Sequence, residues 1–153
     1  MDKKLIQQLI DRYISVSFQV QKKAASLIKE QIEDDLTNDQ LYILRYIHQL
    51  GECTSSVLAE AFDVNKSAIT AIINRMVDRG FIQRTRDEND RRVVYLTLTK
   101  KGIEIHHKTI EKVHHLVASI ITRFEEDEIT NFIETYEKLD LILDNKKKEE
   151  MGE

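Results

Sequence analysis

Residues 65–80 read NKSAITAIINRMVDRG, and this stretch decides the fold. At about 100° per residue, four polar side chains of the predicted helix fall within one quadrant. They are Lys66, Ser67, Thr70 and Asn74. The apolar residues lie on the opposite side, where they can be buried, and Asn65 is the expected N-cap. A face of short donors and acceptors near a helix N-terminus has the chemistry needed to read base edges in a major groove.

The residues before this stretch predict a second helix that pairs with it. Thr54 is a suitable N-cap for a short helix over 55–62, and the turn 63–65 leads into the next helix. Gly80 is placed to end that helix. Further upstream, the capping box TNDQ at 37–40 begins another helix. Two short helices joined by a three-residue turn form a predicted helix-turn-helix.

The segment that follows predicts a β-hairpin. Residues 81–86 and 91–98 have strand patterns, and DEND at 87–90 is rich in turn formers. A hairpin directly after the reading helix is a wing, and Arg91 and Arg92 lie at its tip. Arginines there can enter the minor groove, where the negative potential is strong. Ordinary solvated hairpin charges are the alternative, but the preceding helix-turn-helix favours contact with DNA.

Long amphipathic helices flank the winged segment. Residues 3–32 carry two apolar stripes, and further helices are predicted over 100–124 and after the acidic segment 125–127. One stripe can face the core, so a second stripe favours contact with another copy of the chain. The alternative is a helix whose two stripes are both buried within its own monomer. The charged tail 146–153 is expected to fray.

Composition and charge narrow the class of protein. The chain has 153 residues, no proline and four glycines, which disfavours a barrel or sandwich rich in tight turns. The net charge is −4, yet residues 63–101 hold nine Lys or Arg and five Asp or Glu. This segment is therefore +4 and the remainder −8, so nucleic acid would meet one part of the surface only. Enzyme motifs for nucleophilic, phosphate-binding or metalloprotease chemistry are absent, and no enzyme activity is expected.

The sequence shows neither a membrane-spanning segment nor a signal peptide. No apolar run approaches the roughly 18 residues needed to span a bilayer, and the N-terminal residues lack the apolar region of a signal peptide. We therefore expect a cytoplasmic protein with no membrane partner.

The hairpin and the residues after it resemble a known family. Asp90-Arg91-Arg92 is followed by VYLTLTKKG at 94–102. An acid and an arginine two residues apart, then Leu-Thr and a glycine, resemble the wing signature of the MarR (multiple antibiotic resistance regulator) family of bacterial repressors. The segments 66–70, 74–76 and 78–80 also fit, and the resemblance covers nearly the whole chain.

The resemblance implies roles for individual residues. Asp90 would orient Arg92, and Arg91 or Arg92 would sit in the minor groove, while the polar face would meet the major groove. The candidate DNA-binding residues are thus Asn65, Lys66, Ser67, Thr70, Asn74, Asp90, Arg91 and Arg92. Family members are homodimers whose first and last helices interlock. Ala71 departs from the many members that have arginine there, so their operator sequences should not be transferred.

We therefore predict a mainly α fold with a small β-hairpin wing, in one domain over 1–153. Residues 1–33 and 125–146 would form the helical dimerisation region, 37–100 the winged helix-turn-helix, and 100–124 a long linking helix. The predicted function is a ligand-responsive repressor that binds a pseudo-palindromic operator as a homodimer. A winged-helix protein-interaction module is the alternative, and the regulated genes, the operator and the choice between repressor and activator stay open.

Three groups of residues are candidates for sensing. A small effector could bind between the helical dimerisation region and the winged helix-turn-helix, at Phe18, Tyr42, Arg45 and Tyr46. Simple core packing is the alternative. His107, Glu111 and His114 or His115 are spaced to share a helix face as metal ligands could. Zinc-responsive relatives also use ligands early in the second helix that this chain lacks, so no metal or other cofactor is expected, although a metal-responsive regulator stays open. Cys53, the only cysteine, is a candidate oxidant-sensing thiol. It has no obvious positive neighbour in sequence to lower its pKa, which disfavours this role.

Overall fold

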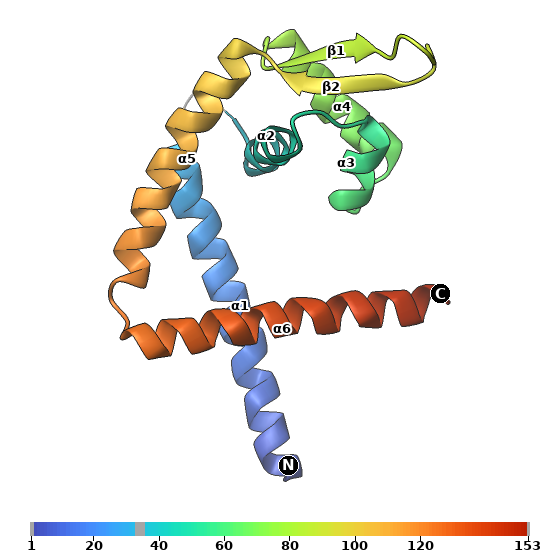
Figure 1. Ribbon diagram of the computed structural model, residues 1–153. Helices are drawn as coiled ribbons and strands as arrows, with labels where there is room; N and C mark the ends of the chain where they lie inside the picture. Colours follow the sequence, from blue (N-terminus) through green and yellow to red (C-terminus); the bar gives the residue numbers. More distant parts are fainter. Residues whose placement is uncertain (1, 33–35, 153) are drawn as a thin grey trace. The chain divides into compact units, whose positions relative to one another are not determined.

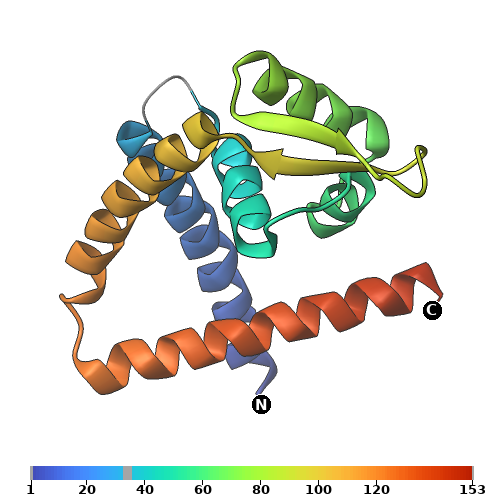
Figure 2. The same ribbon diagram turned by 45° about the horizontal axis from the view of Figure 1, so that its top comes forward.

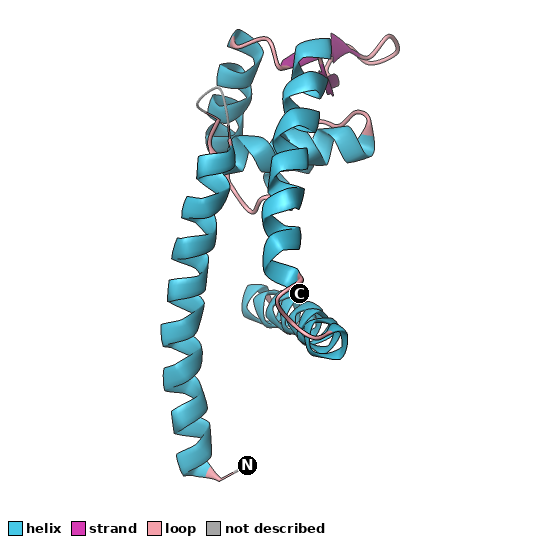
Figure 3. Cartoon of the chain, turned by 90° about the vertical axis from the view of Figure 1, so that its left-hand side faces the viewer, coloured by secondary structure: helices cyan, strands magenta, loops and turns pink. Residues whose placement is uncertain are grey.

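The computed structural model describes residues 2–32 and 36–152, and it consists of helices and one hairpin (Figures 1 and 3). The helices are α1 (Lys3–Gln31), α2 (Asn38–Leu50), α3 (Ser55–Ala61), α4 (Lys66–Asp78), α5 (Lys100–Ile121) and α6 (Glu126–Met151). The strands are β1 (Ile82–Arg86) and β2 (Val94–Leu98). The predicted mainly α fold with a small hairpin is confirmed.

Side-chain caps begin the helices of the helix-turn-helix where the sequence predicts them. At the start of α2, the Thr37 hydroxyl accepts the Gln40 backbone N–H at 3.2 Å, and the Gln40 side-chain oxygen accepts the Thr37 N–H at 3.1 Å. Thr54 caps α3 through the Val57 N–H, and Asn65 caps α4. Each cap satisfies a backbone donor that has no partner within its own helix.

The hairpin pairs β1 and β2 in antiparallel register, from Ile82 opposite Leu98 to Arg86 opposite Val94. Outside the hairpin, Cys53 forms an isolated bridge with Leu96, in which the two residues exchange backbone hydrogen bonds of 3.2 and 2.7 Å. The predicted return strand over 91–98 is three residues too long, because residues 91–93 belong to the turn. The wing is therefore anchored through β2 to the loop between α2 and α3.

The core lies between the helix-turn-helix and the hairpin. β2 packs against α2 and α3, and β1 packs against α4 (Figure 2). The side chains of Leu44, Ile47, Leu58, Ile69, Ile73, Met76, Phe81 and Leu96 are all at most 1% exposed. The members from α2, α3 and α4 form the apolar sides of these helices, and burial of this surface together with Phe81 and Leu96 stabilises the winged helix-turn-helix.

A close backbone contact joins the wing to α5. Gly102 lies so near the chain that an added Cβ would stand 2.0 Å from the Phe81 carbonyl oxygen. The same carbonyl accepts the Thr99 N–H at 3.0 Å, and the Thr99 hydroxyl accepts the Gly102 N–H at 3.0 Å, which starts α5. Only glycine fits this point, which gives the glycine of the sequence signature a physical reason.

The chain divides within α5, between Val113 and His114, into two compact units. The first contains α1 to β2 and the start of α5, and the second contains the rest of α5 and α6. Among the described residues of α1 and α6, none is buried. On α1, for example, Ile14 is 62% and Phe18 is 63% exposed, and on α6 Leu141 is 64% exposed. Both helices therefore carry apolar surface that the single chain leaves uncovered.

The last helix is longer than the sequence predicts. α6 continues to Met151 through KKKEE at 146–150, where fraying was expected. Lysine and glutamate have good helix propensity, so a charged composition does not by itself end a helix. In the part of the chain that the structure describes, no helix is both long and apolar enough to cross a membrane.

Candidate nucleic-acid interface

The α4 helix presents a polar face to solvent. Lys66, Ser67, Thr70 and Asn74 are all exposed, whereas Ile69 and Met76 on the other side are fully buried. The exposed residues begin in the first turn, near the four backbone N–H groups at the helix N-terminus. The predicted division into two faces is therefore present, with the apolar side packed into the core.

Asn65 has a structural role at the start of this face. Its side-chain oxygen accepts the Ala68 backbone N–H at 2.8 Å. The side chain is exposed, and this bond fixes the position of its amide group at the helix N-terminus. Ala71 is also exposed, so the family position that often carries arginine is here a short side chain on the open surface.

Arg84 lies against the far end of the polar face. Its guanidinium group donates a hydrogen bond to the side-chain oxygen of Asn74. The contact joins β1 to α4 and engages one lone pair of the Asn74 carbonyl oxygen, and the amide NH₂ group can donate to an acceptor outside the protein. Arg84 is not among the DNA-binding candidates named from the sequence. Its contact with Asn74 depends on how the hairpin packs on α4, which no local sequence pattern reports.

The wing tip is held by backbone hydrogen bonds to an aspartate. One Asp87 side-chain oxygen accepts the N–H groups of Asn89 at 2.8 Å and Asp90 at 2.9 Å. These two bonds lower the pKa of the Asp87 carboxyl, because they favour its charged form. The Asp87 N–H donates to the Val93 carbonyl at 3.0 Å, which closes the loop. The turn therefore has a defined shape although it is exposed.

Within this turn Asp90 holds Arg92. The Arg92 Nε and Nη2 atoms donate to the two oxygens of the Asp90 carboxylate at 3.0 and 3.1 Å, and the Arg92 backbone N–H donates at 3.0 Å. The side-chain bond to Arg92 is the main reason that the pKa of Asp90 is lowered. The Arg92 side chain is nevertheless 90% exposed. Its guanidinium group is thus oriented by Asp90 and remains accessible to a partner.

The second arginine at the wing tip is placed differently. Arg91 is exposed, and its backbone carbonyl accepts a hydrogen bond from Arg86 Nη1 at 3.3 Å. Lys101 donates to the Arg79 carbonyl at 3.0 Å. Its ammonium group and the Arg79 guanidinium lie 5.0 and 4.9 Å from the centroid of the Phe81 ring. Lys101 therefore contributes to the junction between wing and α5.

The four effector candidates have different surroundings. Phe18, Tyr42 and Arg45 are exposed, while Tyr46 packs edge-on against Phe62 with ring centroids 5.9 Å apart. A cavity of about 420 Å³ elsewhere in the chain is lined by Lys29, Leu36, Thr37, Asn38 and Asp39. For Tyr46 the core-packing alternative describes the observed contact, and an effector site stays a prediction.

The histidines that lie close together in the fold are not those that helical spacing suggested as metal ligands. The potential metal-binding group in the described residues joins His106 and His107 to His48 of α2, a residue that the sequence analysis did not consider. It does not include Glu111, His114 or His115. The spacing of residues along one helix could not identify His48, because it lies 59 residues before His107 in the chain.

Cys53 is buried beside the hairpin. Its side chain is only 5% exposed, and burial raises the pKa of its thiol to about 11. The neutral thiol therefore dominates near neutral pH, whereas a reactive cysteine needs the thiolate. The location favours a packing role for Cys53.

Two paired helices, a hairpin wing and an arginine held at its tip define a winged helix-turn-helix protein. The family described as MarR matches residues 36–94. The HTH-type transcriptional regulator YwhA of Bacillus subtilis is 30% identical over 118 residues, which cover 77% of this chain and 85% of that relative. The chain belongs to the MarR family of transcriptional regulators, whose members are regulators and not enzymes.

Solved structures agree with this assignment. A crystal structure of a MepR-like protein complexed with pseudoligands is 32% identical in sequence, covers 88% of this chain and 95% of its own, and has a TM-score of 0.65. FabT of Streptococcus pneumoniae in complex with DNA is 26% identical, covers 92% of this chain and 98% of its own, and has a TM-score of 0.76.

Proposed function

We propose that this protein is a homodimeric, ligand-responsive repressor that binds double-stranded DNA with sequence specificity. Each protomer would place α4 in one major groove and its wing in the adjacent minor groove. The observation that carries the proposal is the pairing of an exposed polar face on α4 with Arg92, which is oriented by Asp90 and still 90% exposed. The structural neighbour FabT was solved in complex with DNA, which supports DNA binding by a protein of this fold.

The division of labour between the two elements follows from their chemistry. Lys66, Ser67, Thr70 and the Asn74 amide carry short donors and acceptors that suit base edges in the major groove. Arg91 and Arg92 would read the width and negative potential of the minor groove rather than its bases. Arg84 would position Asn74 through their hydrogen bond, so that β1 also shapes the reading face.

The dimer is inferred from the uncovered apolar surface. Ile14, Phe18 and Leu141 are among the large apolar side chains of α1 and α6 that are more than half exposed. Surface of this kind is typical of a subunit interface. A two-fold dimer presents two identical readers, so its operator would be pseudo-palindromic, with half-sites one helical turn, about 34–36 Å, apart.

Repression and ligand response complete the proposal. A dimer that occupies two adjacent grooves excludes other proteins from the same DNA, so repression is the simplest effect. A ligand would release the operator only if it binds better to a dimer whose readers have the wrong spacing. The solved MepR-like protein complexed with pseudoligands supports the search for a small-molecule ligand.

The proposal is tested by selecting DNA fragments from the organism's own genome with the full-length protein. The enriched operator is then titrated at several salt concentrations with wild-type protein, Arg92→Ala and the charge-matched control Lys146→Ala. We expect Arg92→Ala to bind more weakly and to reduce the slope of log affinity against log salt by about 2 per dimer, one contact from each protomer. Lys146→Ala should match the wild type.

Two results would contradict the proposal. If no sequence is enriched, the protein does not read DNA, and the protein-interaction alternative gains weight. If Arg92→Ala and the wild type share the same affinity and salt slope, the wing does not contact the operator. Sedimentation of each variant checks that the oligomeric state is unchanged.

A further inference from the structure

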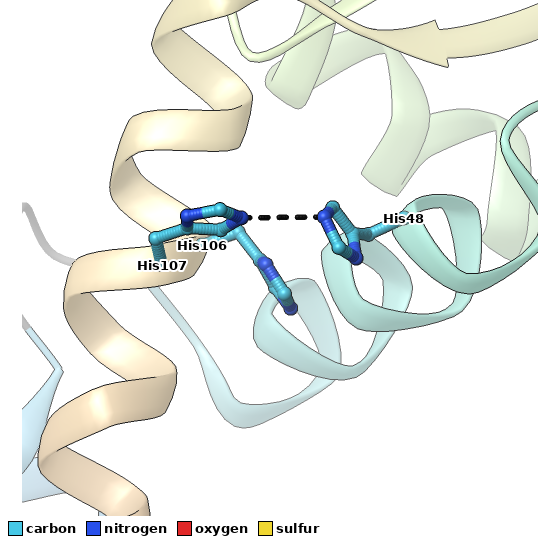
Figure 4. A group of neighbouring side chains, drawn as sticks. All are labelled: His48, His106 and His107. Carbon is cyan, nitrogen blue, oxygen red and sulfur yellow. Dashed lines mark hydrogen bonds between the residues drawn. The ribbon is translucent and has the colours of Figure 1, made fainter.

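Three histidines meet where α2 passes the first turns of α5 (Figure 4). This histidine cluster consists of His48, near the end of α2, with the neighbouring residues His106 and His107 of α5. One ring nitrogen from each residue lies within 4.8 Å of the others. All three belong to the first compact unit, so the cluster is formed within one structural body.

The distances within the cluster suit a metal ion. The Nε2 atoms of His48 and His107 are 3.3 Å apart. Two imidazole nitrogens bound tetrahedrally at 2.0–2.1 Å from one zinc ion would stand about 3.3–3.4 Å apart. Figure 4 shows these two nitrogens facing each other across the space between α2 and α5. A shared ion can therefore join the two helices with little movement of either backbone.

The exposure of the three residues supports the same conclusion. His48 and His107 are exposed, which gives an ion a route from solvent, and His106 is 5% exposed and closes the inner side. His106 stacks on His48 with ring centroids 4.4 Å apart and an interplanar angle of 24°. The nitrogen lone pairs of nearly parallel stacked rings lie in two nearly parallel planes, so one ring must turn about its side-chain bonds for both to point at one ion. The exposed His48 ring has the space to do so.

We propose that His48, His106 and His107 bind one divalent transition-metal ion of the zinc, nickel, cobalt and copper class. An all-imidazole ligand set selects this class, because calcium and magnesium prefer oxygen ligands. Water would occupy the remaining position of a tetrahedral site. The ion would connect α2 of the helix-turn-helix to α5, which begins at Lys100, two residues after the wing ends at Leu98. The metal site itself does not depend on the proposed function; only a role in regulating the operator would rest on it.

The test measures metal binding by full-length protein from which any histidine tag has been removed. The protein is freed of metal with a chelator and titrated with Zn²⁺ by calorimetry at pH 7.5, where ordinary imidazoles are largely neutral and able to bind. A parallel titration with Co²⁺ follows the visible absorption of the bound ion. The variants are His48→Ala, His107→Ala and a matched control, the double variant His114→Ala/His115→Ala.

We expect one ion per protomer for the wild type and for the control. His48→Ala and His107→Ala should each weaken binding at least tenfold, a loss at the lower end of what even outer-shell ligand partners cause. Both residues are exposed, so their removal opens no cavity in the core, and circular dichroism checks the fold. The cobalt absorption should disappear in the same two variants.

Three outcomes would overturn the proposal. The first is wild-type protein that shows no saturable binding. The second is His48→Ala with unchanged affinity, because an ion held by α5 alone does not need α2. The third is loss of binding in the double variant, which would place the ion farther along α5. None of these results depends on whether the protein binds DNA.

Discussion

The contact between Gly102 and Phe81 makes the effect of one methyl group predictable. In Gly102→Ala, the new Cβ would lie 2.0 Å from a backbone carbonyl oxygen, whereas real Cβ contacts essentially never fall below 3.0 Å. The obstacle is backbone and not the end of a flexible side chain. The strand entrance or the first turn of α5 must therefore move by about 1 Å or more, and Phe81, which is 1% exposed, must move with it.

The energy of this movement can be assembled from its parts. Forcing extra atoms into a packed region costs about 1–3 kcal/mol. The hydrogen bond from the Thr99 N–H to the Phe81 carbonyl is worth about 0.5–1.5 kcal/mol if it is lost. Alanine recovers at most about 1 kcal/mol of helix propensity over glycine. We therefore expect the free energy of unfolding to fall by about 2 kcal/mol, and the midpoint of thermal unfolding by about 4–8 °C.

Thermal and urea unfolding measure this loss at one fixed protomer concentration, since a dimer's stability depends on concentration. Glu104→Ala is the matched control, because Glu104 is exposed on the same helix. Gly102→Ala with the stability of the wild type would refute the argument. Such a result would mean that the junction between the wing and α5 can accommodate the methyl group without loss of unfolding free energy.

Three further predictions concern the reading face, the dimer and the buried thiol. Thr70→Ala should reduce discrimination between operator and random DNA by about 1–3 kcal/mol if Thr70 makes a good base contact, and equal losses on both DNAs in competition titrations would contradict base reading. Ile14→Glu places a charge on the uncovered α1 surface and should shift the protein from dimer to monomer in analytical ultracentrifugation; an unchanged sedimentation coefficient would exclude this face from the interface. Burial raises the Cys53 pKa to about 11 from 9.0, so stability from the neutral thiol is complete below about pH 9 and is lost as the pH rises to about 11. The free energy of unfolding of the wild type, measured with urea, should then fall relative to that of Cys53→Ala over this pH range. A difference between the two proteins that stays constant with pH would contradict the raised pKa.

The sequence predicts those parts of the fold that depend on neighbours along the chain. Thr37, Thr54 and Asn65 each cap a helix as expected, because a cap needs only the residue and the backbone that follows it. Gly80, with φ of 77°, follows α4 where a left-handed residue was expected. The two faces of α4 follow from helical periodicity alone, which is why the candidate reading residues could be named in advance.

Contacts between distant segments could not be predicted in the same way. The bond between Arg84 and Asn74 requires the hairpin to lie on α4, and the histidine cluster requires α2 to pass α5. Each depends on packing angles that periodicity does not determine. The return strand was also predicted too early, because Arg91 and Arg92 fit a strand pattern while the Asp90 carbonyl and carboxylate draw the chain into a turn.

The open edge of the hairpin has a consequence for solubility. β2 is covered on one side by β1 and bridged on the other by Cys53, whereas β1 is not paired along its outer edge in the described sheet. Unpaired edges are templates for strand addition by other molecules. Four of the five β1 residues are exposed, and two of these, Arg84 and Arg86, are positively charged. Arg84, which also contacts the reading face through Asn74, and Arg86 thus oppose edge-to-edge pairing between wings, so their replacement by apolar residues would favour aggregation even where the fold survives.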